Sequence, residues 1–150
     1  MGKKFDFGDY SVHLYNKEKA AEEGAPSSKI RYYIDEEDGV TVAVMEDCEY
    51  DAIDILTKMG ITGLLYQGFN LDKFMMNTTY RGKAICSPED IWDEEEGMRI
   101  ARNRMLENYY RARTLALMRA ENVLTKMMDE LGSRIDYSDM RYQKAYNGTL

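Results

Sequence analysis

The sequence predicts an α+β fold in which a small antiparallel β-sheet with a short helix is followed by a long C-terminal α-helix. Two runs rich in β-branched and aromatic residues, 29–34 and 40–46, flank an acidic link at 35–39 and predict a β-hairpin. After residue 92 the chain contains no proline and begins a long helical pattern. A length of 150 residues suits a single domain with its own core.

Three shorter elements are expected between the hairpin and the long helix. Apolar residues at helical spacing predict a short helix over 49–59, and Gly60 supplies a stop for it. The glycine-interrupted apolar stretch 61–70 favours a short strand or a packed loop. Residues 73–86 alternate loosely as a third main strand, with Gly82 as the candidate position of a β-bulge.

Four parts therefore follow one another within one domain. Residues 1–28 are polar and weakly patterned, and we expect little regular structure in them. Residues 29–92 form the sheet-rich part, residues 93–131 form the long helix, and residues 132–150 form a polar tail.

The long helix has a well-marked start and one apolar face. Asp93 is a favourable N-cap, with Glu96 at the capping-box position three residues later. The span to Leu131 is roughly 55 Å at 1.5 Å per residue, longer than a domain of this size normally covers. Alanines at four-residue spacing on the apolar face allow the close approach of a second helix. This face consists of Ala101, Met105, Tyr109, Ala112, Ala116, Ala120, Val123 and Met127.

Two arrangements would cover this apolar face. We predict a homodimer through paired long helices. The alternative is that the first half of the helix packs within the chain, with a kink near Asn108.

Charge is unevenly distributed along the chain. Residues 1–96 contain 10 basic and 21 acidic residues, a net charge of −11, whereas residues 97–150 have a net charge of +4. The isoelectric point near 4.8 argues against general binding to nucleic acid. An acidic surface suits a basic protein partner, including one whose groove normally holds nucleic acid. The candidate partner-binding residues are Asp35, Glu36, Glu37, Asp38, Glu94, Glu95 and Glu96.

Residue patterns typical of catalysis are absent. The single histidine, His13, excludes any site that requires two histidines and makes a histidine-based zinc site improbable. Cys48 and Cys86 lie far apart and are expected to be small buried side chains in a reducing compartment. Neither glycine-rich phosphate-loop pattern occurs. We therefore predict no catalytic residue, no metal site and no cofactor.

Arginines and aromatic residues near the start of the long helix form the alternative ligand site. Arginine forks match phosphate geometry, and aromatic rings stack on bases. The candidate residues are Trp92, Arg99, Arg102, Arg104, Tyr109 and Arg113. The competing interpretation is that these arginines pair with carboxylates of the same chain.

Neither a membrane span nor a signal peptide is expected. The chain has no apolar run near the roughly 20 residues that cross a bilayer, and its first residues lack the apolar core of a signal peptide. We expect the protein to remain in the cytoplasm where it is made.

One segment, residues 80–104, resembles a motif of small uncharacterised proteins of bacteriophages and prophages. The motif joins a strand ending in Gly-x-Ala-x-Cys-x-Pro-x-Asp to an acidic turn with an aromatic residue and then to Gly-x-x-Ile-Ala-x-x-Arg. Here these positions are Gly82, Ala84, Cys86, Pro88, Asp90, Trp92, Gly97, Ile100, Ala101 and Arg104. The resemblance implies a phage origin and brings no catalytic residue with it.

A phage origin implies three hypotheses of function by association. The first is a stoichiometric inhibitor of a CRISPR-Cas nuclease or similar host defence effector, acting in the cytoplasm of the host bacterium. The second is a sponge that sequesters a nucleotide immune signal. The third is a structural or replication accessory protein of the phage.

Overall fold

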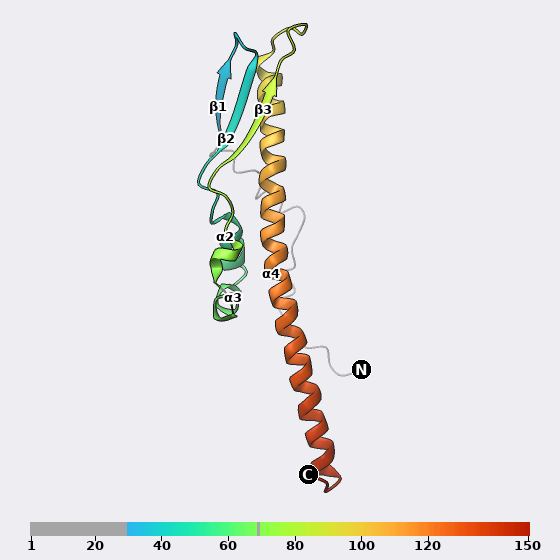
Figure 1. Cartoon of the computed structure of the whole chain (residues 1–150). Helices are drawn as coiled ribbons and strands as arrows, with labels where there is room; N and C mark the ends of the chain where they lie inside the picture. The colour runs from blue at the N-terminus through green and yellow to red at the C-terminus, as the bar shows by residue number, and fades with distance from the viewer. Residues whose placement is uncertain (1–29, 69) are drawn as a thin grey trace.

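The computed structural model describes residues 30–68 and 70–150. In chain order these form β1 (Ile30–Asp35), β2 (Val40–Met45), α2 (Asp51–Lys58), α3 (Thr62–Gly68), η3 (Leu71–Phe74), β3 (Tyr80–Ile85) and α4 (Glu94–Tyr146). Figure 1 shows the sheet and the short helices side by side along one long helix, α4. The predicted α+β class is therefore confirmed. The expectations for residues 1–28, including His13, lie outside the described residues.

The sheet has three antiparallel strands in the order β1-β2-β3. Its third strand begins at Tyr80, later than the predicted start at Lys73, because residues 71–74 form the 3₁₀ helix η3. The candidate bulge at Gly82 is wrong, since the pairing of β2 with β3 is continuous and Gly82 faces Ala43. This regular ladder fixes which strand residues face α4.

Gly82 has a different function, which is to let α4 approach the sheet. A Cβ atom at this position would lie 2.1 Å from the carbonyl oxygen of Ala101 and 2.3 Å from the amide nitrogen of Met105. No side chain fits between β3 and the helix backbone there. Around this contact, the inward-facing residues of β2 and β3 and the first turns of α4 form the first core cluster, which includes Ala43, Met45, Tyr80, Ala84, Ala101 and Met105.

The short helices form a second core cluster farther along α4. Leu56 of α2, Leu65 of α3 and Phe74 of η3 pack with Ala120 and Val123 of α4. Residues 62–68 are therefore a helix, and the predicted strand or packed loop at 61–70 was wrong. The segment folds back as a helix because this brings Leu65 into the cluster, where it is fully buried.

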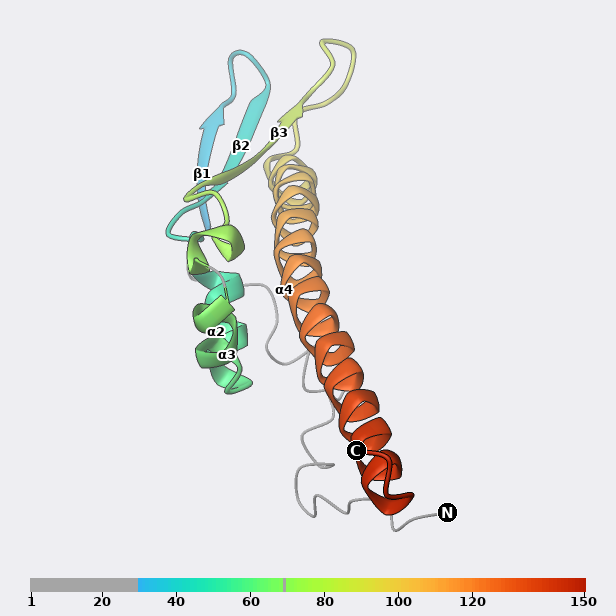
Figure 2. The same ribbon diagram turned by 60° about the horizontal axis from the view of Figure 1, so that its bottom comes forward.

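Helix α4 is much longer than predicted. It runs for 53 residues to Tyr146, which is about 80 Å, and Figure 2 shows its C-terminal part extending well beyond α3. The expectation that the helix ends near Leu131 before a polar tail was wrong. An interior glycine such as Gly132 costs only about 1 kcal/mol relative to alanine and does not stop a helix without proline. The observed end follows at Gly148, which has a φ of +69°.

The apolar face of α4 is covered within the chain as far as Val123. Ala116 and Ala120, which were expected to approach a second copy, are buried against the chain's own elements. The helix is continuous through Asn108, whose side chain donates a hydrogen bond of 3.1 Å to the carbonyl oxygen of Arg81. The alternative of packing within the chain thus describes this half of α4, without the kink. None of the helices in the described ranges is long and apolar enough to cross a membrane.

Candidate functional site

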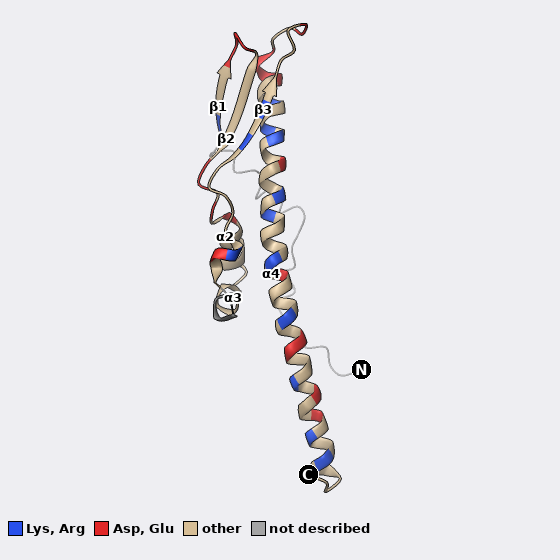
Figure 3. Cartoon of the chain, in the orientation of Figure 1, with Lys and Arg blue, Asp and Glu red and all other residues tan. Residues whose placement is uncertain are grey.

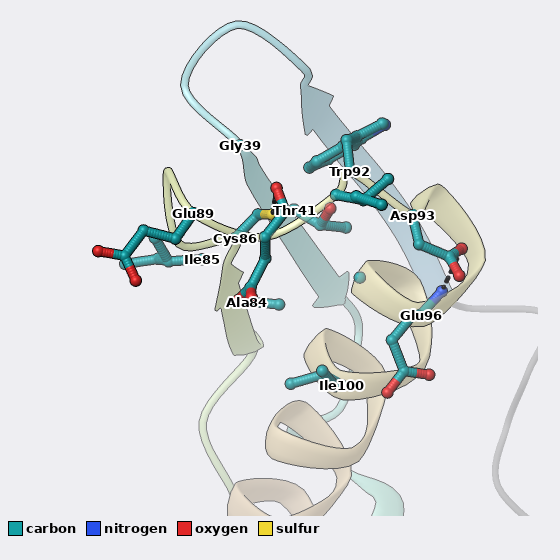
Figure 4. A pocket seen from close by; sticks show the side chains of 13 residues that line it. Gly39, Thr41, Ala84, Ile85, Cys86, Glu89, Trp92, Asp93, Glu96 and Ile100 are labelled. Carbon is teal, nitrogen blue, oxygen red and sulfur yellow. Dashed lines mark hydrogen bonds between the residues drawn. The ribbon is translucent and has the colours of Figure 1, made fainter.

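A cavity of about 570 Å³ lies at the end of the molecule where β2, β3 and the start of α4 meet. The connection 86–93 between β3 and α4 forms its outer wall, and Figure 4 shows side chains of strands, connection and helix around it. The lining residues are Gly39, Thr41, Ala84, Ile85, Cys86, Glu89, Asp90, Ile91, Trp92, Asp93, Glu96, Gly97 and Ile100. We call this site the terminal pocket.

Backbone contacts hold the wall of the terminal pocket in place. Gly39, with a φ of +61°, ends the hairpin turn and accepts a 2.6 Å hydrogen bond from the amide of Cys86. The amide of Asp90 donates to the carbonyl of Ser87 over 2.9 Å, so residues 87–90 form a tight turn. These bonds anchor the connection to the hairpin at one end, while the N-cap of α4 anchors it at the other.

The N-cap of α4 is confirmed as predicted. The Asp93 carboxylate accepts a hydrogen bond of 3.2 Å from the amide of Glu96. The carboxylates of Glu94, Glu95 and Glu96 follow in the first turn, where the helix dipole favours negative charge. Local helix chemistry therefore places acidic side chains beside the terminal pocket.

The two predicted acidic segments lie at the same end of the molecule. The turn from Asp35 to Asp38 joins β1 to β2, and the segment 94–96 begins α4; Figure 3 shows both in red at the same end. All seven predicted partner-binding carboxylates are exposed. Glu89, Asp90 and Asp93 are exposed on the connection that lines the terminal pocket. We call this combined surface, formed by the acids of 35–38 and 89–96, the acidic end.

Exposed apolar residues accompany these charges. The Ile91 side chain is 93% exposed and that of Ile85 is 65% exposed, and both line the terminal pocket. Trp92, the only tryptophan, is half-buried in the same wall. The acidic end thus has exposed apolar side chains near its carboxylates.

Thr41 is the polar residue at the floor of the terminal pocket. It is 1% exposed, and its hydroxyl oxygen is buried with no hydrogen-bond partner among the described residues. Gly97 of α4 lies directly over it, because an added Cβ at Gly97 would be 2.8 Å from this oxygen. A buried hydroxyl without a partner costs free energy, so Thr41 is an unfavourable polar group beneath the pocket.

The predicted arginine-aromatic residues do not form one site, although Arg113 interacts with the hydroxyl of Tyr109. Arg99 forms an ion pair with Glu96 at 2.6 Å, and this hydrogen bond lowers the pKa of Glu96. The Arg104 guanidinium donates to the carbonyl of Lys83. Arg113 lies 5.3 Å from the centre of the Tyr110 ring, and Arg102 is exposed. None of the four arginines lines the terminal pocket.

The prediction that Tyr109 contacts a ligand is wrong. Its side chain is 2% exposed and lies in the first core cluster. Its hydroxyl donates a hydrogen bond of 2.6 Å to the carboxylate of Asp51. A buried ring offers no face for stacking on a ligand, so Tyr109 is a residue of the core. Of the predicted ligand residues, Trp92 alone lines the terminal pocket.

The two cysteines differ in how deeply they are buried. Cys48 is fully buried, as expected, whereas Cys86 is half-exposed in the wall of the terminal pocket. The expectation of burial was therefore wrong for Cys86. Neither of them forms a disulfide bond. Across residues 30–68 and 70–150, no cluster of three or more histidine, cysteine or acidic side chains has a geometry suited to a metal ion.

The residue that the sequence analysis missed is Thr41. Its position in the strand Val40–Met45 offered a signal, because it shares the inward-facing side with Ala43 and Met45. A threonine at such a position is a polar group placed in a core. Comparison with known proteins adds nothing to these observations, since no family model, no curated protein and no solved structure matches the chain.

Proposed function

We propose that this protein is a binding protein without enzymatic activity, and that its acidic end occupies a basic, nucleic-acid-binding groove of a host defence protein. The specific form of the proposal is stoichiometric inhibition of a CRISPR-Cas or similar nuclease effector in the cytoplasm of a phage-infected bacterium. One observation carries it: two acidic segments far apart in the sequence lie at one end of the molecule, the end that also holds a pocket with exposed apolar residues.

Charge supports a basic partner. Four carboxylates from the turn 35–38 and six from 89–96 gather at the acidic end. Such a field attracts a positively charged surface and speeds its association, and it competes with the phosphates that the surface normally binds. Because exposed charges are screened within about 8 Å at physiological salt, binding is expected to weaken as ionic strength rises.

The terminal pocket supports a particular mode of contact, the insertion of a lysine or arginine side chain from the partner. Ala84, Trp92 and Ile100 offer apolar surface for the stem of such a side chain. The exposed carboxylates of Glu89, Asp90 and Asp93 among the lining residues attract its charged head. Exposed Ile91 then packs on apolar atoms beside the inserted residue, as in the centre of many protein interfaces.

The target class comes from the phage resemblance of residues 80–104, and a plaque assay tests it directly. In a bacterium whose CRISPR-Cas system restricts a phage, expression of the protein is expected to restore plaque formation. The variant Glu36→Lys/Glu37→Lys, changed at the exposed turn, is expected to lose this effect. The control Asp129→Lys/Asp136→Lys makes the same change in net charge on an exposed part of α4 far from the acidic end, and it should retain activity.

A binding measurement with the purified effector tests whether inhibition is direct, which the plaque assay alone does not show. We expect a one-to-one complex whose dissociation constant rises at least tenfold in the Glu36→Lys/Glu37→Lys variant and rises with salt. Full inhibition by this variant would overturn the role of the acidic end. Restored plaques without any complex between the protein and the effector would overturn direct inhibition.

The geometry gives the nucleotide sponge less support. The arginines proposed for that function are engaged separately along α4 and do not line the terminal pocket. The pocket itself is rimmed by carboxylates, which repel phosphate groups. A clear rise in Tm with added nucleotides would reverse this preference. No observation favours the structural or replication accessory function.

A further inference from the structure

The C-terminal part of α4 has an apolar stripe that the chain's own described elements leave open. Beyond Met127 every described side chain is exposed or half-buried, and Figure 2 shows α4 continuing there past the other labelled elements. Met128 is 72% exposed, Leu131 58% and Ile135 59%. An isolated helix of this kind is marginal in water, so a partner that covers the stripe would stabilise it.

The stripe has the spacing of a coiled coil. Intervals of four and three residues alternate along Leu124, Met128, Leu131, Ile135, Ser138 and Tyr142. Projected at 100° per residue, these six positions fall within a sector of about 80°. In heptad terms Met128, Ile135 and Tyr142 occupy position a, while Leu124, Leu131 and Ser138 occupy position d. We call these six residues the seam; it extends about 27 Å along the helix axis. Its first member, Leu124, is partly buried against the second core cluster, and the other five are exposed.

We propose that the seam joins two copies of this chain in a parallel, two-stranded coiled coil. The central residues favour two strands, because isoleucine at position a with leucine at position d packs best in a parallel dimer. Ile135 and the leucines of positions d fit this preference. The contact differs from the dimer expected from the sequence, which used the alanine stripe that the chain itself now covers.

Charges beside the seam select the parallel orientation. Arg134 and Arg141 occupy successive g positions, and Asp139 occupies an e position. In a parallel pair each g residue faces the e residue five positions later in the other helix, so Arg134 faces the partner's Asp139 and forms an ion pair twice. An antiparallel pair would instead place g opposite g and bring the arginines together. In the single chain Arg134 forms an exposed 2.9 Å ion pair with Glu130 of its own helix. Because exposed ion pairs contribute little free energy, this pair can be replaced by the one with the partner at little cost.

The mass of the full chain in solution is the first test. Sedimentation equilibrium at tens of micromolar is expected to give twice the 17.4 kDa of one chain. The variant Leu131→Asp/Ile135→Asp should be monomeric, with its sheet and core intact because both side chains are exposed in the single chain. The control Met140→Asp changes an exposed methionine outside the seam and should remain dimeric. A monomeric wild-type protein at these concentrations overturns the proposal.

Orientation is tested by cross-linking and by charge exchange. In a Cys86→Ser background, Ser138→Cys places a thiol opposite itself only in the parallel register, so oxidation should give a covalent dimer. Met140→Cys in the same background should not cross-link. Arg134→Asp and Asp139→Arg should each raise the dimer dissociation constant about tenfold, and the two changes together should restore it. A dimer that fails to cross-link at position 138 overturns the parallel arrangement.

Discussion

Tyr109 of α4 and Asp51 of α2 are joined by a hydrogen bond of 2.6 Å between the phenol hydroxyl and a carboxylate oxygen. Asp51 is the first residue of α2, where the positive end of the helix dipole also stabilises its carboxylate. The Tyr109 ring lies edge-to-face with Tyr80 of β3, their centres 5.7 Å apart. This one residue thus connects the long helix both to the sheet and to the short helices.

Replacing Tyr109 by phenylalanine tests the strength of that connection. The variant keeps the buried ring and loses the hydroxyl that donates to Asp51. A hydrogen bond to a charged group stabilises by about 1.5–3 kcal/mol, and we expect the free energy of unfolding to fall by that amount. Urea denaturation at neutral pH measures it. A change below about 0.5 kcal/mol would show that Asp51 is equally well satisfied without the phenol.

The same residue predicts how stability depends on alkaline pH. Burial, together with the hydrogen bond to Asp51, raises the pKa of Tyr109 well above its usual value, and burial also raises the pKa of Tyr80. In the unfolded chain both phenols lose their protons near pH 10, so above that pH the folded state binds more protons than the unfolded state. Stability is therefore fully present below about pH 10 and decreases as pH rises further.

The Tyr109→Phe variant is the control for this dependence, since it removes the group with the larger pKa shift. Its free energy of unfolding, measured between pH 8 and 11, should fall less steeply than that of the wild type. Parallel curves for the two proteins would contradict the role assigned to Tyr109.

Gly82→Ala is expected to be the most damaging small substitution. Its Cβ would meet the backbone of α4 at Ala101 and Met105, and a helix backbone cannot move aside as a flexible side chain does. We expect a loss of about 3 kcal/mol or more, measured by chemical denaturation. Gly132→Ala is the matched control: nothing lies within 4 Å of its added Cβ, and it should stabilise α4 by about 0.5–1 kcal/mol. Equal effects of the two changes would contradict the close packing of β3 on α4.

Local signals predicted the elements whose chemistry lies within a few residues. The acidic turn with Gly39 and the N-cap Asp93 marked the hairpin and the start of α4 close to their observed positions. The helix within segment 61–70 was not predicted because it depends on the packing of Leu65 in a cluster formed by residues far away in the sequence. The predicted end at residue 131 was wrong because Gly132 alone does not stop a helix, and α4 continues to Tyr146.

The charge of the candidate site could be predicted from the sequence, but its shape could not. Runs of acids at 35–38 and 94–96 are visible in the sequence, but their placement at one end of the molecule depends on the pairing of β2 with β3. That pairing places Thr41 opposite Ala84 and brings Gly39 to Cys86, which closes the terminal pocket. Conversely, Tyr109 looked suited to stacking because helical spacing alone does not tell which aromatic residue the sheet will cover.

Thr41→Val is expected to make the free protein more stable. The buried hydroxyl has no hydrogen-bond partner within the described residues, and removing an unsatisfied polar group recovers about 1 kcal/mol. The matched variant Thr41→Ser keeps the hydroxyl, loses a buried methyl group and should be less stable than the wild type. Thermal and urea unfolding measure both changes. A destabilised valine variant would show that the hydroxyl is already satisfied, for example by water.

Asp93 allows charge at the acidic end to be separated from helix stability. Asp93→Ala removes the oxygen that accepts from the Glu96 amide, and loss of an N-cap costs about 1 kcal/mol. Asp93→Asn keeps an acceptor oxygen and should stay within about 0.5 kcal/mol of the wild type. Both variants remove the same negative charge from the terminal pocket. If the partner recognises that charge, the two should weaken binding equally while differing in unfolding free energy. Weakened binding in the alanine variant alone would instead show that the partner depends on the folded start of α4.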